Sequence, residues 1–144
     1  MNNVKALNKW ANAHTYLPID LLRMALGVFL FMKGVYFFSN SQYLVDMLSP
    51  IESLDRFGSV EMFAIHYIAP AHLIGGILIF CGLLTRWAII SQLPILISAI
   101  IINFMGQMHH QNLLVAFLCL VISLFFLLYG SGKNSADYFF KMQV

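Results

Sequence analysis

The side chains that could do chemistry in this chain are a few basic and amide groups set in apolar sequence. The 144 residues are 60% hydrophobic and 10% charged, and they include five histidines. An imidazole can carry a proton near neutral pH or bind a metal or haem, and a cationic side chain can stabilise an anion. The candidate ligand-binding residues are Arg23, Lys33, His66, His72, Asn103, His109 and His110.

His72 has the most informative surroundings. It shares a helical face with Gly75 and Gly76, and a face that carries glycine packs against a neighbouring helix more often than against lipid. We therefore expect His72 to be a buried polar group that needs a partner. Pro70 has no backbone N–H, so it removes the helical partner of the His66 carbonyl and predicts a kink between these two residues.

Arg23 and Lys33 lie within an apolar stretch, where a charge costs at least a few kcal/mol. Arg23 falls on one helical stripe with Gly27 and Gly34, and this stripe is expected to face other helices. Arg23 either anchors one end of the helix by reaching the interface or is a buried functional group, and Asp20 is close enough in sequence for an ion pair. Lys33 either extends to the headgroups or points inward to an anionic or redox-active ligand.

The histidines leave three interpretations open. They are interfacial or hydrogen-bonded residues, a proton or quinone site, or a metal or haem site. No spacing matches a metal-binding signature, so no metal is predicted, and the absence of C-x-x-C argues against a thiol redox enzyme. The cofactor remains unknown from the sequence, with a quinone favoured over haem.

The composition decides the class of protein. A soluble domain has about 25% charged residues, so this chain is too apolar for a water-facing surface. Disorder is excluded by the high hydrophobicity, and nucleic-acid binding is disfavoured because the eight Lys and Arg residues form no basic patch. The sequence therefore predicts a small integral membrane protein.

Four apolar segments are long enough to cross a bilayer, at about residues 19–38, 63–84, 87–104 and 113–129. Their short connections favour an all-α, up-down-up-down four-helix bundle that forms a single membrane domain over residues 1–144. Apolar residues at helical spacing between Tyr43 and Ile51, ending near Pro50, predict a short interfacial helix in the first outer loop.

The basic residues outside these segments predict the orientation. One side of the predicted bundle carries Lys5, Lys9, Arg86, Lys133 and Lys141. Because basic residues favour the cytoplasmic side, we expect a protein of the bacterial inner membrane with both termini in the cytoplasm. All candidate histidines then lie in the outer half or the outer loops. Together with Lys33, Glu61 and the side-chain amides of Asn103, Gln107 and Gln111, they predict a polar pocket on the outer side.

Short motifs resemble those of the DoxX family of small membrane proteins. The run Ile19–Gly27 with Lys33-Gly34 resembles the first helix of that family. The run His72–Gly76 and the turn from Gly82 to Arg86 resemble its second helix and its G-L-x-T-R turn, and the tail from Tyr129 to Asp137 resembles its C-terminal end. The resemblance implies a four-helix membrane bundle and a link to quinone-dependent oxidoreductase subunits or oxidative-stress responses. Where the family typically has an acidic residue before the glycine pair, this chain has His72.

The sequence leaves three functions open. The first is a redox-linked, quinone-associated subunit of the membrane. The second is a non-enzymatic accessory subunit that stabilises or recruits a larger membrane complex, and the third is a small oligomeric transporter. The expected partners are the lipid bilayer and either a larger complex or further copies of the chain. The sequence supplies no assembled catalytic set, so it leaves open whether the protein is an enzyme.

Overall fold

The fold was analysed in a computed structural model, which describes residues 2–14, 16–52, 62, 64–105 and 110–143. The chain forms helices α1 (Asn2–Ala13), α2 (Leu17–Ser39) and α3 (Ser41–Glu52), then a π-helix η1 (Ala64–Ile68). Helices α5 (Ala69–Cys81), α6 (Thr85–Met105), α7 (His110–Tyr129) and α8 (Ala136–Phe139) follow. All regular secondary structure in these described ranges is helical.

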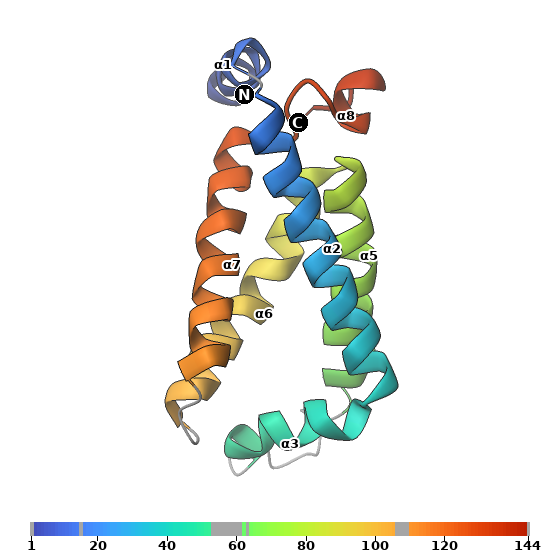
Figure 1. Cartoon of the computed structure of the whole chain (residues 1–144), viewed down its shortest axis with the longest axis vertical. Helices are drawn as coiled ribbons and strands as arrows, with labels where there is room; N and C mark the ends of the chain where they lie inside the picture. The colour runs from blue at the N-terminus through green and yellow to red at the C-terminus, as the bar shows by residue number, and fades with distance from the viewer. Residues whose placement is uncertain (1, 15, 53–61, 63, 106–109, 144) are drawn as a thin grey trace.

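The long helices run side by side, and both chain termini lie at the same end of the molecule (Figure 1). Helices α1 and α8 lie at this end, which we call the terminal end, and α3 crosses the opposite end. The expected helix between Tyr43 and Ile51 is confirmed as α3. Helices α2, α6 and α7 are each long and apolar enough to cross a membrane, as their sequence predicted.

The second predicted span differs most from expectation. Instead of one helix over residues 63–84, the chain forms η1 and then the shorter apolar helix α5. The change occurs beside Pro70, which cannot donate the backbone hydrogen bond of a continuous α-helix. α5 ends at Cys81 because Gly82 adopts the left-handed conformation with φ of 68°.

Glycines bring α2 and α5 into close contact. A Cβ atom at Gly27 would lie 2.5 Å from the backbone nitrogen of Phe80, and one at Gly76 would lie 2.5 Å from that of Phe31. Gly34 makes a similar approach to Leu73. The stripe of α2 that carries Arg23 and these glycines is buried, which confirms that it faces other helices.

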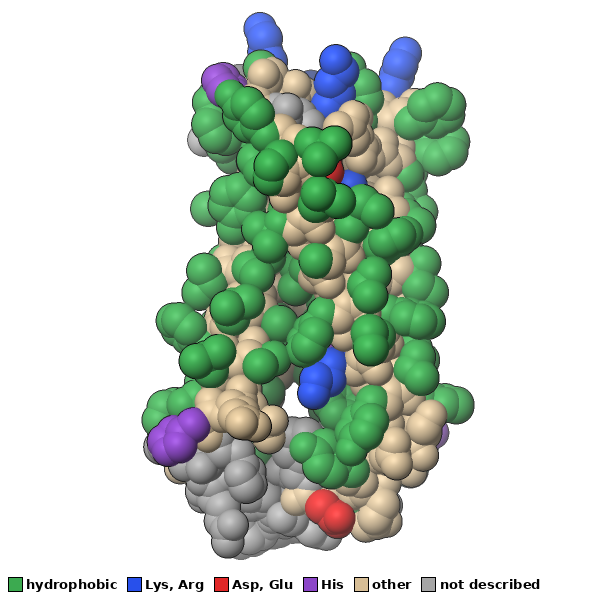
Figure 2. Space-filling view, viewed as in Figure 1, with side chains coloured by type: hydrophobic (Ala, Val, Ile, Leu, Met, Phe, Trp, Pro, Cys, Tyr) green, Lys and Arg blue, Asp and Glu red, His purple; other side chains and the backbone are tan. Residues whose placement is uncertain are grey.

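The apolar core lies between the long helices and is centred on Leu30, Ile79, Ile89 and Phe126. α2 packs mainly on α5, whereas α7 packs mainly on α6. The surface is predominantly apolar along the length of the molecule, and Figure 2 shows an opening in it between α2 and α7 with a basic side chain at its edge.

Candidate functional site

His72 occupies the buried position that the sequence predicted. Its side chain on α5 is only 5% exposed, and its ring centroid lies 5.7 Å from that of Phe37 on α2. The Nδ1 atom has no hydrogen-bond partner within the described part of the chain. A buried polar atom without a partner costs about 1–3 kcal/mol of stability. An unpartnered atom of this kind therefore calls for an explanation, such as a functional role or a bound partner molecule.

Lys33 on α2 lies close enough to His72 on α5 for its charge to act on the imidazole. Its side chain is half-buried, and Nζ lies 5.8 Å from the centroid of the Phe29 ring, within range of a cation–π contact. The ammonium charge acts on both the His72 ring and the Cys119 thiol, which lies on α7. We call the region around Lys33, His72 and Cys119, which lie on α2, α5 and α7, the interior site.

Two further polar side chains near the helix contacts were missed by sequence reasoning. Gln92 on α6 is fully buried, and its Nε2 donates a hydrogen bond to the Ala71 carbonyl while Oε1 has no partner among the described residues. Ser123, one turn from Cys119 on α7, is also fully buried with an unpartnered Oγ in those ranges. Their only sequence signal is a single polar residue within an otherwise apolar helix.

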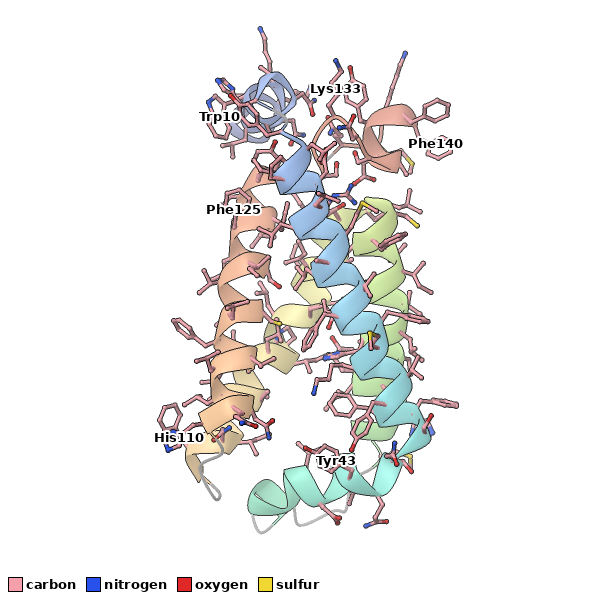
Figure 3. The ribbon with its side chains drawn as sticks, in the orientation of Figure 1. Trp10, Tyr43, His110, Phe125, Lys133 and Phe140 are labelled. Carbon is pink, nitrogen blue, oxygen red and sulfur yellow. The ribbon has the colours of Figure 1, made fainter. Side chains whose placement is uncertain are left out.

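The other predicted residues lie elsewhere. His66 is exposed, and its Nδ1 lies 2.9 Å from the Met62 carbonyl oxygen within the same segment. His110 is exposed at the start of α7 and points away from the other helices (Figure 3). Asn103 is half-buried near the end of α6, and His109 lies outside the described residues. Of the predicted set, Lys33 and His72 lie close enough for the charge of the lysine to act on the imidazole.

Arg23 lies near the terminal end and is engaged with backbone carbonyls. The side chain is 2% exposed. Its Nη1 donates to the carbonyl oxygens of Ile79 at 2.7 Å and Phe80 at 3.0 Å, and its Nη2 donates to that of Asn134 at 3.0 Å. The first two carbonyls lie in the last turn of α5, where a cation is favoured by the helix dipole, and that of Ile79 also accepts a hydrogen bond from the Gly82 backbone N–H. A Cβ at Gly82 would lie 2.5 Å from Nη1, so the glycine makes room for the guanidinium.

Asp137 plays the complementary role at the start of α6. One carboxylate oxygen accepts a hydrogen bond from the Leu84 backbone N–H at 2.7 Å, and the other accepts one from that of Thr85 at 3.1 Å. A carboxylate at a helix N-terminus is favoured both by these N–H groups and by the dipole. Asn134, from the same C-terminal segment, donates to Asp20 at 2.7 Å. The segment after α7 is therefore fixed to the beginnings of α2 and α6.

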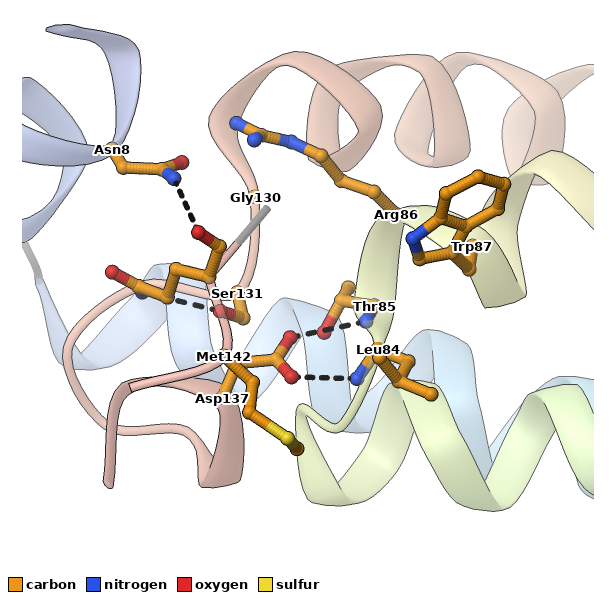
Figure 4. A pocket seen from close by; sticks show the side chains of 10 residues that line it. Asn8, Leu84, Thr85, Arg86, Trp87, Gly130, Ser131, Asp137 and Met142 are labelled. Carbon is orange, nitrogen blue, oxygen red and sulfur yellow. Dashed lines mark hydrogen bonds between the residues drawn. The ribbon is translucent and has the colours of Figure 1, made fainter. Parts of the chain in front are cut away.

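Arg86 completes this arrangement at the end of α7. Its Nε donates to the Leu127 carbonyl and its Nη2 to the Leu128 carbonyl, at 3.0 and 3.1 Å. Arg86, Thr85 and Asp137 line a small cleft that opens to the solvent (Figure 4). Their hydrogen bonds go to helix ends, so these residues act structurally by joining the turn between α5 and α6 to the C-terminal segment.

Taken together, three span-length apolar helices and buried charged groups that cap helix ends are the properties of a multi-pass helical membrane protein. The chain belongs to the DoxX family, whose sequence model matches residues 19–106, more than half of the chain. The family resemblance read from the sequence motifs is thereby confirmed. Comparisons with curated proteins and with solved structures gave no match.

Proposed function

We propose that the protein is a redox-linked subunit of the bacterial inner membrane that binds a quinone at the interior site. In this proposal α2, α5, α6 and α7 cross the membrane as an up-down-up-down bundle, and α3 lies at the outer interface. The proposal has both termini in the cytoplasm, which the basic residues at the terminal end support. The interior site then lies in the outer half of the bundle, because Lys33 and His72 are closer to α3 than to the termini along their helices.

The observation that carries the proposal is the unpartnered Nδ1 of the buried His72 beside the Lys33 ammonium. A quinone has two carbonyl oxygens on an apolar ring, so it fits a site that offers one hydrogen-bond donor, one cation and apolar walls. A bound quinone would supply two-electron, two-proton chemistry. His72 would donate a hydrogen bond to one carbonyl and relay a proton to it, and Lys33 would stabilise negative charge on the same oxygen.

The opening between α2 and α7 supports access to this site from within the bilayer. A quinone is dissolved in the lipid, so a lateral entrance suits it better than an entrance from the water. The apolar outer faces of both helices allow the lipid to reach that opening, since Met32 on α2 and Leu118 on α7 are exposed.

A binding experiment tests the proposal directly. The purified protein in lipid nanodiscs would be titrated with a short-chain ubiquinone, and bound quinone would be measured by mass spectrometry after extraction. Replacing His72 with leucine removes the donor and should weaken binding roughly tenfold, the loss expected for one buried hydrogen bond. Lys33→Met should weaken it to a similar extent. Lys133→Met, which removes an exposed lysine at the terminal end, is the matched control and should leave the affinity unchanged.

The outcomes separate the remaining functions. Equal quinone binding by all four proteins, or none by the unaltered protein, would refute the interior quinone site. A redox-linked subunit also needs a partner that supplies electrons, so purification in mild detergent should recover a stoichiometric partner. Recovery of that partner without quinone binding would instead favour the accessory subunit, and flux of a solute through the reconstituted protein would favour the transporter.

A further inference from the structure

The terminal end carries exposed positive charge with no exposed acidic side chain among its described residues. Lys5 and Lys9 on α1 and Lys133 and Lys141 in the C-terminal segment are all exposed. The acidic residues of this end, Asp20 and Asp137, are buried and hydrogen-bonded. At the opposite end, Asp46 on α3 is exposed, so the molecule is electrically asymmetric along its long axis.

Large aromatic side chains surround the same end. Trp10 is 56% exposed, Trp87 is 59% exposed, and Phe139 and Phe140 on and after α8 are also exposed. In Figure 3, Trp10 and Phe140 point outward on opposite sides of the molecule, whereas Lys133 points along the long axis and away from the helices. At a membrane interface, aromatic rings are expected at the level of the headgroups, with lysines beyond them. The terminal end has this arrangement.

This surface is held in place by contacts on its inner side. Asn12 of α1 donates to the side-chain oxygen of Gln143 at 2.8 Å, and the Tyr129 hydroxyl donates to the carbonyl of Ala11 at 3.2 Å. Lys5 and Lys9 are four residues apart and lie one above the other on α1, and both are exposed, although Asn12 lies on the same side of the helix. The lysines of α1 are therefore presented outward by a fixed helix.

We propose that the terminal end is a binding surface for anionic phospholipids, formed by α1 and the C-terminal segment together. The aromatic rings insert at the boundary of headgroups and acyl chains, and the lysines attract phosphate groups that carry a net negative charge. A zwitterionic lipid satisfies the aromatic contacts equally well but gains little from the lysines. The expected consequence is a preference for anionic over zwitterionic lipid at this end.

The protein contains its own probe for this preference. Its two tryptophans, Trp10 and Trp87, both lie in the elements of this end, and Trp87→Phe leaves Trp10 on α1 as the single reporter. The full-length variant would be reconstituted into vesicles of phosphatidylcholine and phosphatidylglycerol in which one lipid or the other is brominated. Quenching of Trp10 at equal mole fraction then compares the two lipids at this position.

We expect brominated phosphatidylglycerol to quench Trp10 more strongly, and this difference should shrink in high salt because surface charges are screened. Lys5→Gln with Lys9→Gln should reduce the preference several-fold, up to about fivefold for each lysine. The matched pair Lys5→Arg with Lys9→Arg should retain it, and Asp46→Asn at the opposite end should not alter it.

Equal quenching by both lipids in the protein with native lysines would overturn the proposal and leave only a neutral aromatic belt. The same conclusion would follow from a preference that neither salt nor the glutamine pair reduces. The salt dependence is measured without altering the lysines, so the test does not depend on the folding of the glutamine variant. Loss of quinone binding in the interior site would not affect this result, which makes the two proposals separable.

Discussion

Replacing Arg23 with leucine should cost about 3–5 kcal/mol in the free energy of unfolding, because the hydrogen bonds of a buried guanidinium are lost. The guanidinium makes three hydrogen bonds to backbone carbonyls, of which those to Ile79 and Phe80 lie in the last turn of α5. Each charge-assisted bond contributes about 1.5–3 kcal/mol, and the burial of the guanidinium offsets part of their sum. Leucine fills some of the space but leaves the carbonyls without these donors.

Unfolding in mixed micelles of a mild detergent and dodecyl sulfate, followed by circular dichroism, would measure this loss. Arg23→Lys retains the charge but has one terminal nitrogen instead of the planar fork, so it should lose about half as much. Lys133→Leu removes an exposed cation at the same end and serves as the control. A change of less than about 0.5 kcal/mol for Arg23→Leu, typical of a surface substitution, would refute the assignment of Arg23 as a helix cap.

Two further substitutions test other contacts by the same assay. Gly76→Leu should cost about 2–3 kcal/mol because its Cβ would lie 2.5 Å from the Phe31 backbone nitrogen, so α2 and α5 must move apart. Ile77→Leu, at the exposed next position, should be near neutral, and equal losses for the two would contradict close glycine packing. Asp137→Asn should lose about 1–2 kcal/mol by removing the charge that caps α6, and an unchanged stability would show that the carboxylate charge is unimportant there.

The helices were largely predictable because their signals are local. Continuous apolar runs indicate α2, α6 and α7, and the spacing of Gly27 and Gly34 indicates which face of α2 is buried. The apolar residues around Tyr43 likewise predict α3. The division of the second span was less visible, since hydropathy is the same on both sides of Pro70 and only the missing N–H distinguishes the two segments.

The cluster at the terminal end could not be predicted, because its contacts join residues far apart in the chain. Asp137 caps a helix that begins more than 50 residues earlier, and Asn134 pairs with Asp20 across most of the sequence. The sequence suggested an ion pair between Asp20 and Arg23, but each group finds its hydrogen bonds elsewhere, with the C-terminal segment supplying a partner to both. Such contacts depend on where a loop returns, which residue spacing does not encode.

Burial of the interior site was predictable only for His72, whose glycine-bearing face indicates a helix contact. Lys33 could equally have extended to the headgroups, since a lysine stem reaches several ångströms from its helix. The structure places it half-buried, in contact with an aromatic ring and near the Cys119 thiol. The burial of Gln92 and Ser123 was not predicted, because a single polar residue in an apolar helix does not indicate which side of that helix packs against other helices.

The identity of residue 72 has a consequence for the ligand. The family resemblance implies an acidic side chain at this position, and a carboxylate beside Lys33 would form a neutral pair. An imidazole cannot neutralise that ammonium, and the described residues provide no carboxylate paired with Lys33. A cation held away from water without an anion is costly, so the site should attract an electron-rich or anionic group.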